Sequence, residues 1–129
     1  MDTTVLVDVQ QNDPQWADWS IAQLRAQSSV HQLVINPVIY AEMSLSYSTL
    51  ETLDKVVAKM ELAVLEIPRP ALFLAAKADA MYRRRGGNKH QVLPDFFIGA
   101  HAAVLGCSLL TREAARFCTY FPTLQVLAT

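Results

Sequence analysis

Short apolar runs alternate with longer mixed segments along the chain, and this alternation predicts both the elements and the fold class. The runs at 4–7, 33–35, 62–67, 107–110 and 124–127 are mostly apolar, as expected of strands that are buried on both faces. The segments between them are long enough for helices, so consecutive strands are expected to be parallel. Right-handed crossovers then give an α/β three-layer sandwich around one five-stranded sheet.

Capping residues, prolines and glycines mark the expected helix ends. Asn36-Pro37 pairs an N-cap residue with a proline at the first helical position, and Ser48 with Glu51 fits a capping box. A helix that starts at Pro70 is expected to stop at Gly86-Gly87. The expected helices cover about residues 14–27, 37–47, 49–60, 70–85 and 95–106.

Acidic residues lie close to several of these element ends. Asp8 directly follows the first apolar run, and Glu113 follows the fourth by three residues. Asp95 falls in the first turn of its helix, and Glu42 falls in the helix after the second run. Because the carboxyl ends of parallel strands meet at one edge of a sheet, all of these acids are expected near that edge.

Glu42 is the acid with the most unusual surroundings. Helical spacing groups it with Val38, Ile39 and Leu45, which are all apolar. A carboxylate on such a face is partly desolvated, which costs several kcal/mol unless it has a partner. The sequence therefore predicts a base or a metal ion beside Glu42.

Asp95 shares its helix face with small residues at offsets of 4, 7 and 11, which are Gly99, Ala102 and Gly106. Small side chains allow the helix backbone to approach its neighbour closely. We therefore expect this face to pack tightly and to bring Asp95 near the sheet. The start of a helix also favours the ionised carboxylate.

Each acid has an ordinary explanation when it is considered alone. Asp8 could cap a turn, Asp95 could be a plain N-terminal helix acid, and Glu113 could be a solvated surface residue. Together, converging carboxylates repel one another, and a hard dication such as Mg²⁺ or Mn²⁺ offsets that repulsion. Such an ion holds a phosphodiester, activates a water and stabilises the leaving oxygen.

The chain resembles the PIN domain family, and within it the VapC-type toxins of bacterial toxin–antitoxin pairs. The resemblance runs from Val5 to about Leu127, so one PIN-like domain over residues 1–129 is expected. It rests on the order and spacing of "VLVD" at 5–8, "INPVIYAEM" at 35–43, "LPDFFIGAHA" at 93–102, "LLTREAARF" at 109–117 and "YFPTLQVL" at 120–127.

The resemblance implies a sheet of strand order 3-2-1-4-5 and a Mg²⁺- or Mn²⁺-dependent endoribonuclease. It further implies an RNA substrate, an antitoxin protein that inserts a peptide across the site, and a homodimer. Thr111 matches the hydroxyl residue that supports the fourth acid. The residues that match the family's catalytic and metal-binding acids are Asp8, Glu42, Asp95 and Glu113.

Two positions of the implied metal site differ from the family's usual residues. Glu113 stands where Asp is common, and Gln10 stands where a small polar residue is usual. A PIN-fold module that binds RNA or a partner with weak or no catalysis is therefore a second hypothesis. A phosphotransfer domain of similar layering is a third, ranked last because Gln10 replaces the second Asp of a DxD motif.

The formal net charge of −1 hides a division between the two halves of the chain. Residues 1–68 contain nine acids and three bases, whereas residues 69–129 contain three acids and eight bases. The division is either ordinary surface charge or a basic region that faces a polyanion. The candidate RNA contacts, which could equally be solvated residues near helix ends, are Lys77, Arg83, Arg84, Arg85 and Arg112.

Several other classes are disfavoured by the sequence. The sequence contains no run of about 20 apolar residues, so no membrane span is expected. The N-terminus lacks the basic region of a secretory signal. Cys107 and Cys118 form no CxxC pair, so two reduced thiols and a cytoplasmic location are expected. His31, His90 and His101 lack zinc spacing, and His101 is expected to be a packed or surface residue.

Overall fold

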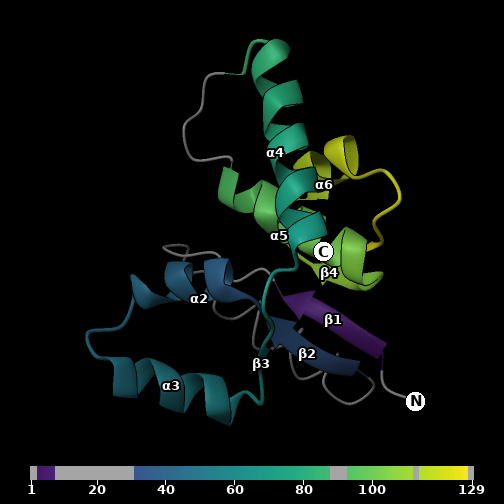
Figure 1. Ribbon diagram of the computed structural model, residues 1–129. Helices are drawn as coiled ribbons and strands as arrows, with labels where there is room; N and C mark the ends of the chain where they lie inside the picture. Colours follow the sequence, from purple (N-terminus) through teal and green to yellow (C-terminus); the bar gives the residue numbers. More distant parts are fainter. Residues whose placement is uncertain (1–2, 8–30, 88–92, 112–113, 128–129) are drawn as a thin grey trace.

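The computed structural model of the protein describes residues 3–7, 31–87, 93–111 and 114–127. Within these ranges the strands form one parallel sheet of order β3-β2-β1-β4-β5 (Figure 1), which confirms the predicted fold class and strand order. The strands are β1 Thr3–Val7, β2 His31–Ile35, β3 Ala63–Val64, β4 Ser108–Leu110 and β5 Val126–Leu127. The described helices are α2 Pro37–Ser44, α3 Leu50–Lys59, α4 Arg69–Arg84, α5 Leu93–Leu105 and α6 Ala114–Tyr120.

The central strand β1 is covered on both of its faces. The consecutive residues Val5, Leu6 and Val7 are at most 1% exposed. Since successive side chains of a strand point to opposite faces, both faces of the sheet must be covered at β1. Its run of β-branched and aliphatic residues suits this doubly buried position.

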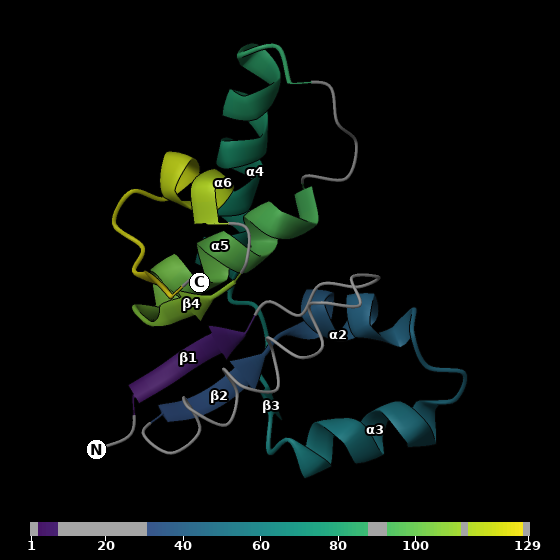
Figure 2. The same ribbon diagram turned by 180° about the vertical axis from the view of Figure 1, so that it is seen from behind.

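The helices form two groups around the sheet. Figures 1 and 2 show α4, α5 and α6 gathered above β1 and β4, whereas α2 and α3 lie beside β2 and β3. Aromatic rings join the upper group: Phe96 of α5 contacts Tyr82 of α4, and also Tyr120 and Phe121 at the end of α6. These edge-on contacts fix α5, which also carries Asp95, against its neighbours.

Several element ends differ from the sequence-based expectation. The side chain of Thr49, rather than that of Ser48, caps α3 by accepting a hydrogen bond from the backbone N–H of Thr52. The helix α2 ends at Ser44, three residues earlier than expected. The strand β3 covers only two residues of the predicted run 62–67, because its partner β2 ends at Ile35, which pairs with Val64.

The predicted end of α4 is confirmed. Gly86 has a φ of +87°, a left-handed conformation that glycine adopts without the steric cost of a Cβ atom. The predicted helix at about 14–27 lies outside the described residues. No helix in the described part of the chain is both long and apolar enough to cross a membrane.

Candidate functional site

The carboxyl ends of the central strands meet at one edge of the sheet. Val7, the last residue of β1, pairs with Leu110, the last residue of β4. Thr111 follows β4 and is fully buried, and Asn36 follows β2 and begins α2. Two polar residues, Asn36 after β2 and Thr111 after β4, therefore lie at this edge of the sheet.

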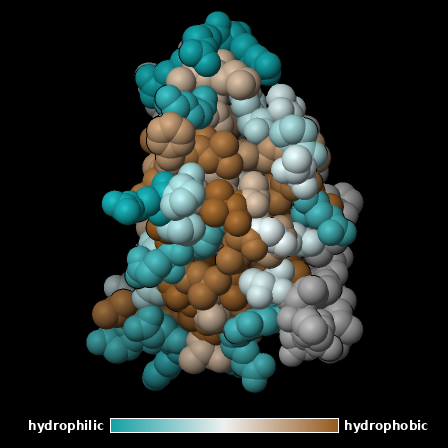
Figure 3. Space-filling view, turned by 45° about the vertical axis from the view of Figure 1, so that its right-hand side comes forward, coloured by the Kyte–Doolittle hydropathy of each residue, from teal (hydrophilic) through white to brown (hydrophobic). Residues whose placement is uncertain are grey.

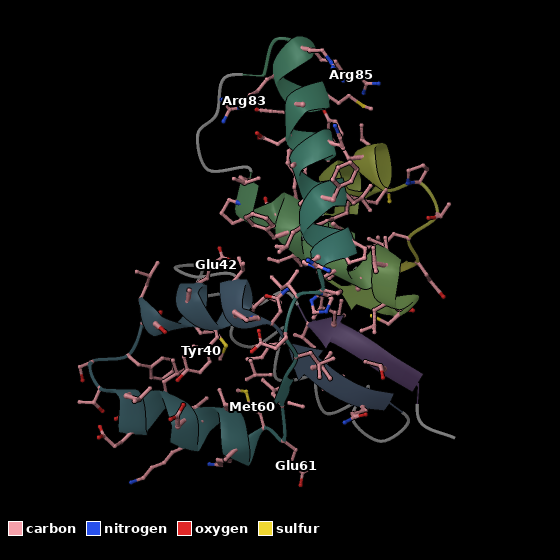
Figure 4. All side chains as sticks on the ribbon, viewed as in Figure 1. Tyr40, Glu42, Met60, Glu61, Arg83 and Arg85 are labelled. Atoms are coloured by element: carbon pink, nitrogen blue, oxygen red, sulfur yellow. The ribbon has the colours of Figure 1, made fainter. Side chains whose placement is uncertain are left out.

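Glu42 is placed by α2, which starts at this edge. The side chain of Asn36 caps the helix by accepting the backbone N–H of Ile39 at 2.9 Å, and Pro37 occupies the first turn. Figure 4 shows Glu42 on the side of α2 that faces the start of α5. The Oε1 atom of Glu42 is buried and has no hydrogen-bond partner among the described residues. This confirms the prediction of a partly desolvated carboxylate.

Asp95 is the second acid that the structure brings to this place. It lies in the first turn of α5 and is only 7% exposed. Burial, and secondarily the charge of Asp95, raises the pKa of Glu42 from its ordinary 4.5 to about 7. The two carboxylates therefore act on each other electrostatically, as expected of acids that share a site.

This pair of carboxylates fits a hard dication. A buried carboxylate oxygen without a partner costs free energy, and a second carboxylate nearby adds repulsion. Both costs are offset by Mg²⁺ or Mn²⁺, which prefer oxygen ligands. The described residues alone contain no group of three or more potential metal ligands. The other predicted members of the site, Asp8, Gln10 and Glu113, lie outside the described residues.

Two expectations about the surroundings of these acids are wrong. Leu45, the C-cap of α2, keeps helical dihedrals but is 79% exposed, so it does not help to bury Glu42. The expected close packing of the small-residue face is confirmed at Gly99, where atoms of Phe117 and Phe121 lie within 3 Å of the place of a Cβ atom, but it is wrong at Gly106. Gly106 lies in open space with a φ of +72°, so it follows the end of α5 as a left-handed residue and does not contribute to close packing.

The basic residues of α4 are not brought to the acids. Figure 4 shows Arg83 and Arg85 at the end of α4 that lies far from Glu42. Arg83 forms an ion pair with Asp79 one turn earlier, at 3.0 Å, and the guanidinium of Arg85 lies over the ring of Tyr120. These contacts fit residues at a helix end, and an RNA contact there stays a prediction. Arg112 lies outside the described residues.

The sequence did not predict the hydrogen bond between Asn36 and His101. The sequence predicts Asn36 only as a helix cap and His101 as a packed or surface residue. The Nδ2 atom of Asn36 lies 3.2 Å from Nδ1 of His101, and both side chains are buried. A single polar residue inside the otherwise small and apolar stretch "IGAHAAV" is the signal that could have indicated a buried partner.

Replacing Glu42 by glutamine is expected to stabilise the metal-free protein at high pH. The pKa of Glu42 is about 7 in the folded protein and 4.5 in the unfolded chain. Ionising Glu42 therefore costs more free energy in the folded protein, and the stability of the fold decreases as pH rises from the lower pKa through the higher one. At pH 8 the free energy of unfolding of Glu42→Gln should be about 1 to 2 kcal/mol larger than that of the native protein, a value reduced to allow for the partial exposure of Glu42.

Urea unfolding with chelator present measures this difference at pH 5 and pH 8. At pH 5 the advantage of Glu42→Gln should shrink, because the folded native protein then carries a neutral Glu42. The exposed acid Glu66 supplies the control, Glu66→Gln, which should show no such pH dependence. An equal advantage of Glu42→Gln at both pH values would contradict the placement of Glu42.

Comparisons with known proteins agree with this architecture. The chain can be superposed on VapBC-1 from nontypeable Haemophilus influenzae with a TM-score of 0.69 and 17% identity, over 97% of this chain and 96% of that chain. DNA-bound VapBC from Salmonella typhimurium gives a TM-score of 0.68 at 19% identity, over 99% and 98%. VapBC2 from Rickettsia felis, bound to a promoter DNA fragment, gives 0.67 at 14% identity, over 97% and 98%.

At these identities the solved structures show a shared fold. No curated protein matches the sequence. The sequence model of the PIN domain matches residues 1–119, which is most of the chain and includes the ends of β1, β2 and β4 with the acids beside them. The chain therefore belongs to the PIN domain family.

Proposed function

We propose that the chain is a Mg²⁺- or Mn²⁺-dependent endoribonuclease that acts as the toxin of a toxin–antitoxin pair. The observation that carries this proposal is the buried Oε1 atom of Glu42, which lacks a hydrogen-bond partner among the described residues and is under the influence of Asp95. A protein that only needed to fold would be more stable with an apolar residue at such a place. A dication would convert the cost into a binding site.

In this proposal the acids at the carboxyl edge of the sheet hold the ion. Glu42 and Asp95 would be joined by Asp8 and Glu113, with Gln10 near the first acid and Thr111 supporting the last. The ion, when bound, would position the scissile phosphodiester and activate a water. The partial burial of Glu42 strengthens its interaction with a cation because the surroundings screen charge less than water does.

The partners follow from the surface and from the fold. Large apolar side chains are exposed on α4 and at the end of α5, among them Phe73 at 65% and Leu105 at 44%. Figure 3 shows apolar surface along the middle of one face, between hydrophilic ends. Exposed apolar surface of this kind suits a protein interface. We propose that the chain binds an antitoxin, since the similar structures named above are VapBC complexes, and that it forms a homodimer.

The substrate in this proposal is RNA. The basic end of α4, with Lys77, Arg83, Arg84 and Arg85, would contact the RNA backbone, and such contacts would weaken with increasing salt. The location is expected to be cytoplasmic, where RNA and a protein antitoxin are both present.

Cleavage of total cellular RNA by the full-length chain tests the proposal. Cleavage is expected with added Mn²⁺ or Mg²⁺ and is expected to stop in excess chelator, because the carboxylates alone cannot orient a phosphodiester. Glu42→Gln protein, purified in parallel, distinguishes this chain from a contaminating ribonuclease. Cleavage that continues in chelator, or that is equal in the variant, would contradict the proposal. Binding of RNA without any cleavage would favour a PIN-fold binding module.

A further inference from the structure

Two buried polar side chains from different helices form a hydrogen bond with each other. Among the described residues the buried polar or charged side chains are Asn36, Asp95, His101 and Thr111. Asp95 and Thr111 belong to the proposed site. Asn36 and His101 are 65 positions apart, yet their side chains form a hydrogen bond in the interior. Because burying polar groups is costly unless they are fully satisfied, the pair needs a reason beyond packing.

The direction of this hydrogen bond is fixed by the cap of α2. The backbone N–H of Ile39 donates to Oδ1 of Asn36, so the Nδ2 group of the amide must face His101. An amide Nδ2 group can only donate, and Nδ1 of His101 must therefore accept. A histidine that accepts at Nδ1 is neutral and carries its proton on Nε2. Burial, which lowers the pKa of His101, favours the same neutral form.

The bond joins the two helices that carry the acids. Asn36 caps α2, and Glu42 lies six residues further along. His101 lies within α5, and Asp95 lies six residues before it. Six residues of helix span about 9 Å, so each acid sits at a similar distance from the bond. Although α2 and α5 belong to the two different groups of helices seen in Figure 1, they contact each other directly.

We propose that Asn36 and His101 are positioning residues, whose buried hydrogen bond ties α2 to α5 and holds the Glu42 and Asp95 carboxylates at the spacing that a dication requires. The inference rests on the proposed function. Ligand placement matters to within about 0.5 Å. Over an arm of about 9 Å, a tilt of about 4° is enough to exceed that tolerance.

Three variants separate the hydrogen bond from the cap. His101→Leu fills the space with an apolar side chain and removes the acceptor. Asn36→Ser keeps an oxygen that can cap α2 but removes the Nδ2 donor and is too short to reach Nδ1 of His101. His101→Asn is the conservative control, because its amide oxygen can take the place of Nδ1.

Mn²⁺ binding to the full chain, measured by calorimetry, tests the proposal. His101→Leu and Asn36→Ser are each expected to weaken Mn²⁺ affinity by about 10-fold or more, as outer partners of metal ligands do. His101→Asn should recover most of the native affinity. Circular dichroism shows whether each variant is folded, and the ¹⁵N spectrum of His101 reads its tautomer without any metal.

The outcomes separate the positioning role from the proposed function. Native-like Mn²⁺ affinity in folded His101→Leu and Asn36→Ser would overturn the positioning role while leaving the proposed function intact. A proton on Nδ1 of His101 in the native protein would also overturn the positioning role. If both variants lost the native circular dichroism spectrum, the bond would serve folding alone and the positioning role would be overturned. If the native chain bound no Mn²⁺, the proposed function itself would fail, and this role with it.

Discussion

Replacing Asp95 by asparagine is expected to lower the rate of RNA cleavage by at least about 100-fold, since even outer partners of a metal site are worth about 10- to 100-fold. The amide occupies nearly the same volume as the carboxylate, so packing around α5 should persist. The charge is lost at a side chain that is 7% exposed and that acts on Glu42. Cleavage at several Mn²⁺ concentrations measures the effect, and part of the loss should be recovered at high Mn²⁺.

The matched control is Asp79→Asn, the same exchange on the surface of α4. It removes one ion pair with Arg83, whose side chain is 69% exposed while that of Asp79 is 19% exposed, and pairs at the surface are worth at most about 1 kcal/mol. The control should therefore cleave RNA at nearly the native rate. Equal rates for Asp95→Asn and the native protein would mean that Asp95 takes no part in the reaction.

The fold could be predicted from the sequence because its signals are local. Apolar runs such as 4–7 and the cap Asn36-Pro37 act within a few residues, and the crossover rule then restricts the topology. The errors lie where a distant contact decides. Leu45 follows Glu42 at helical spacing, but it is 79% exposed. Nothing in the spacing shows whether another element covers this residue.

The site was predictable only in part. Glu42 was recognisable because a charged residue interrupts an apolar face, and the structure confirms that its carboxylate is partly buried. The bond between Asn36 and His101 joins residues 65 positions apart, and no local pattern encodes such a partner. The role of the small residues in α5 was likewise set by tertiary packing, since Gly99 faces two phenylalanines.

The interior of the α4, α5 and α6 group should be the most sensitive part of the described fold to mutation. Phe96 is 0% exposed and has its ring centroid 5.1 Å from that of Tyr120 and 5.9 Å from that of Tyr82. Phe96→Ala is expected to lower the free energy of unfolding by about 3 to 5 kcal/mol, through lost burial and the cavity that remains. For a chain of this size that corresponds to a fall in Tm of about 10 to 20 °C.

The control for this prediction is Phe73→Ala, the same change on the exposed side of α4. Phe73 is 65% exposed, and its ring contacts Lys77, so the loss should stay near about 0.5 kcal/mol. Urea unfolding of both variants gives the comparison, and similar losses would contradict the assignment of Phe96 to the core. Because Asp95 directly precedes Phe96, a loosened α5 should also weaken Mn²⁺ binding in Phe96→Ala, whereas Phe73→Ala should bind Mn²⁺ as the native chain does. Stability and metal affinity would then fall together only where the aromatic contacts hold α5 in place.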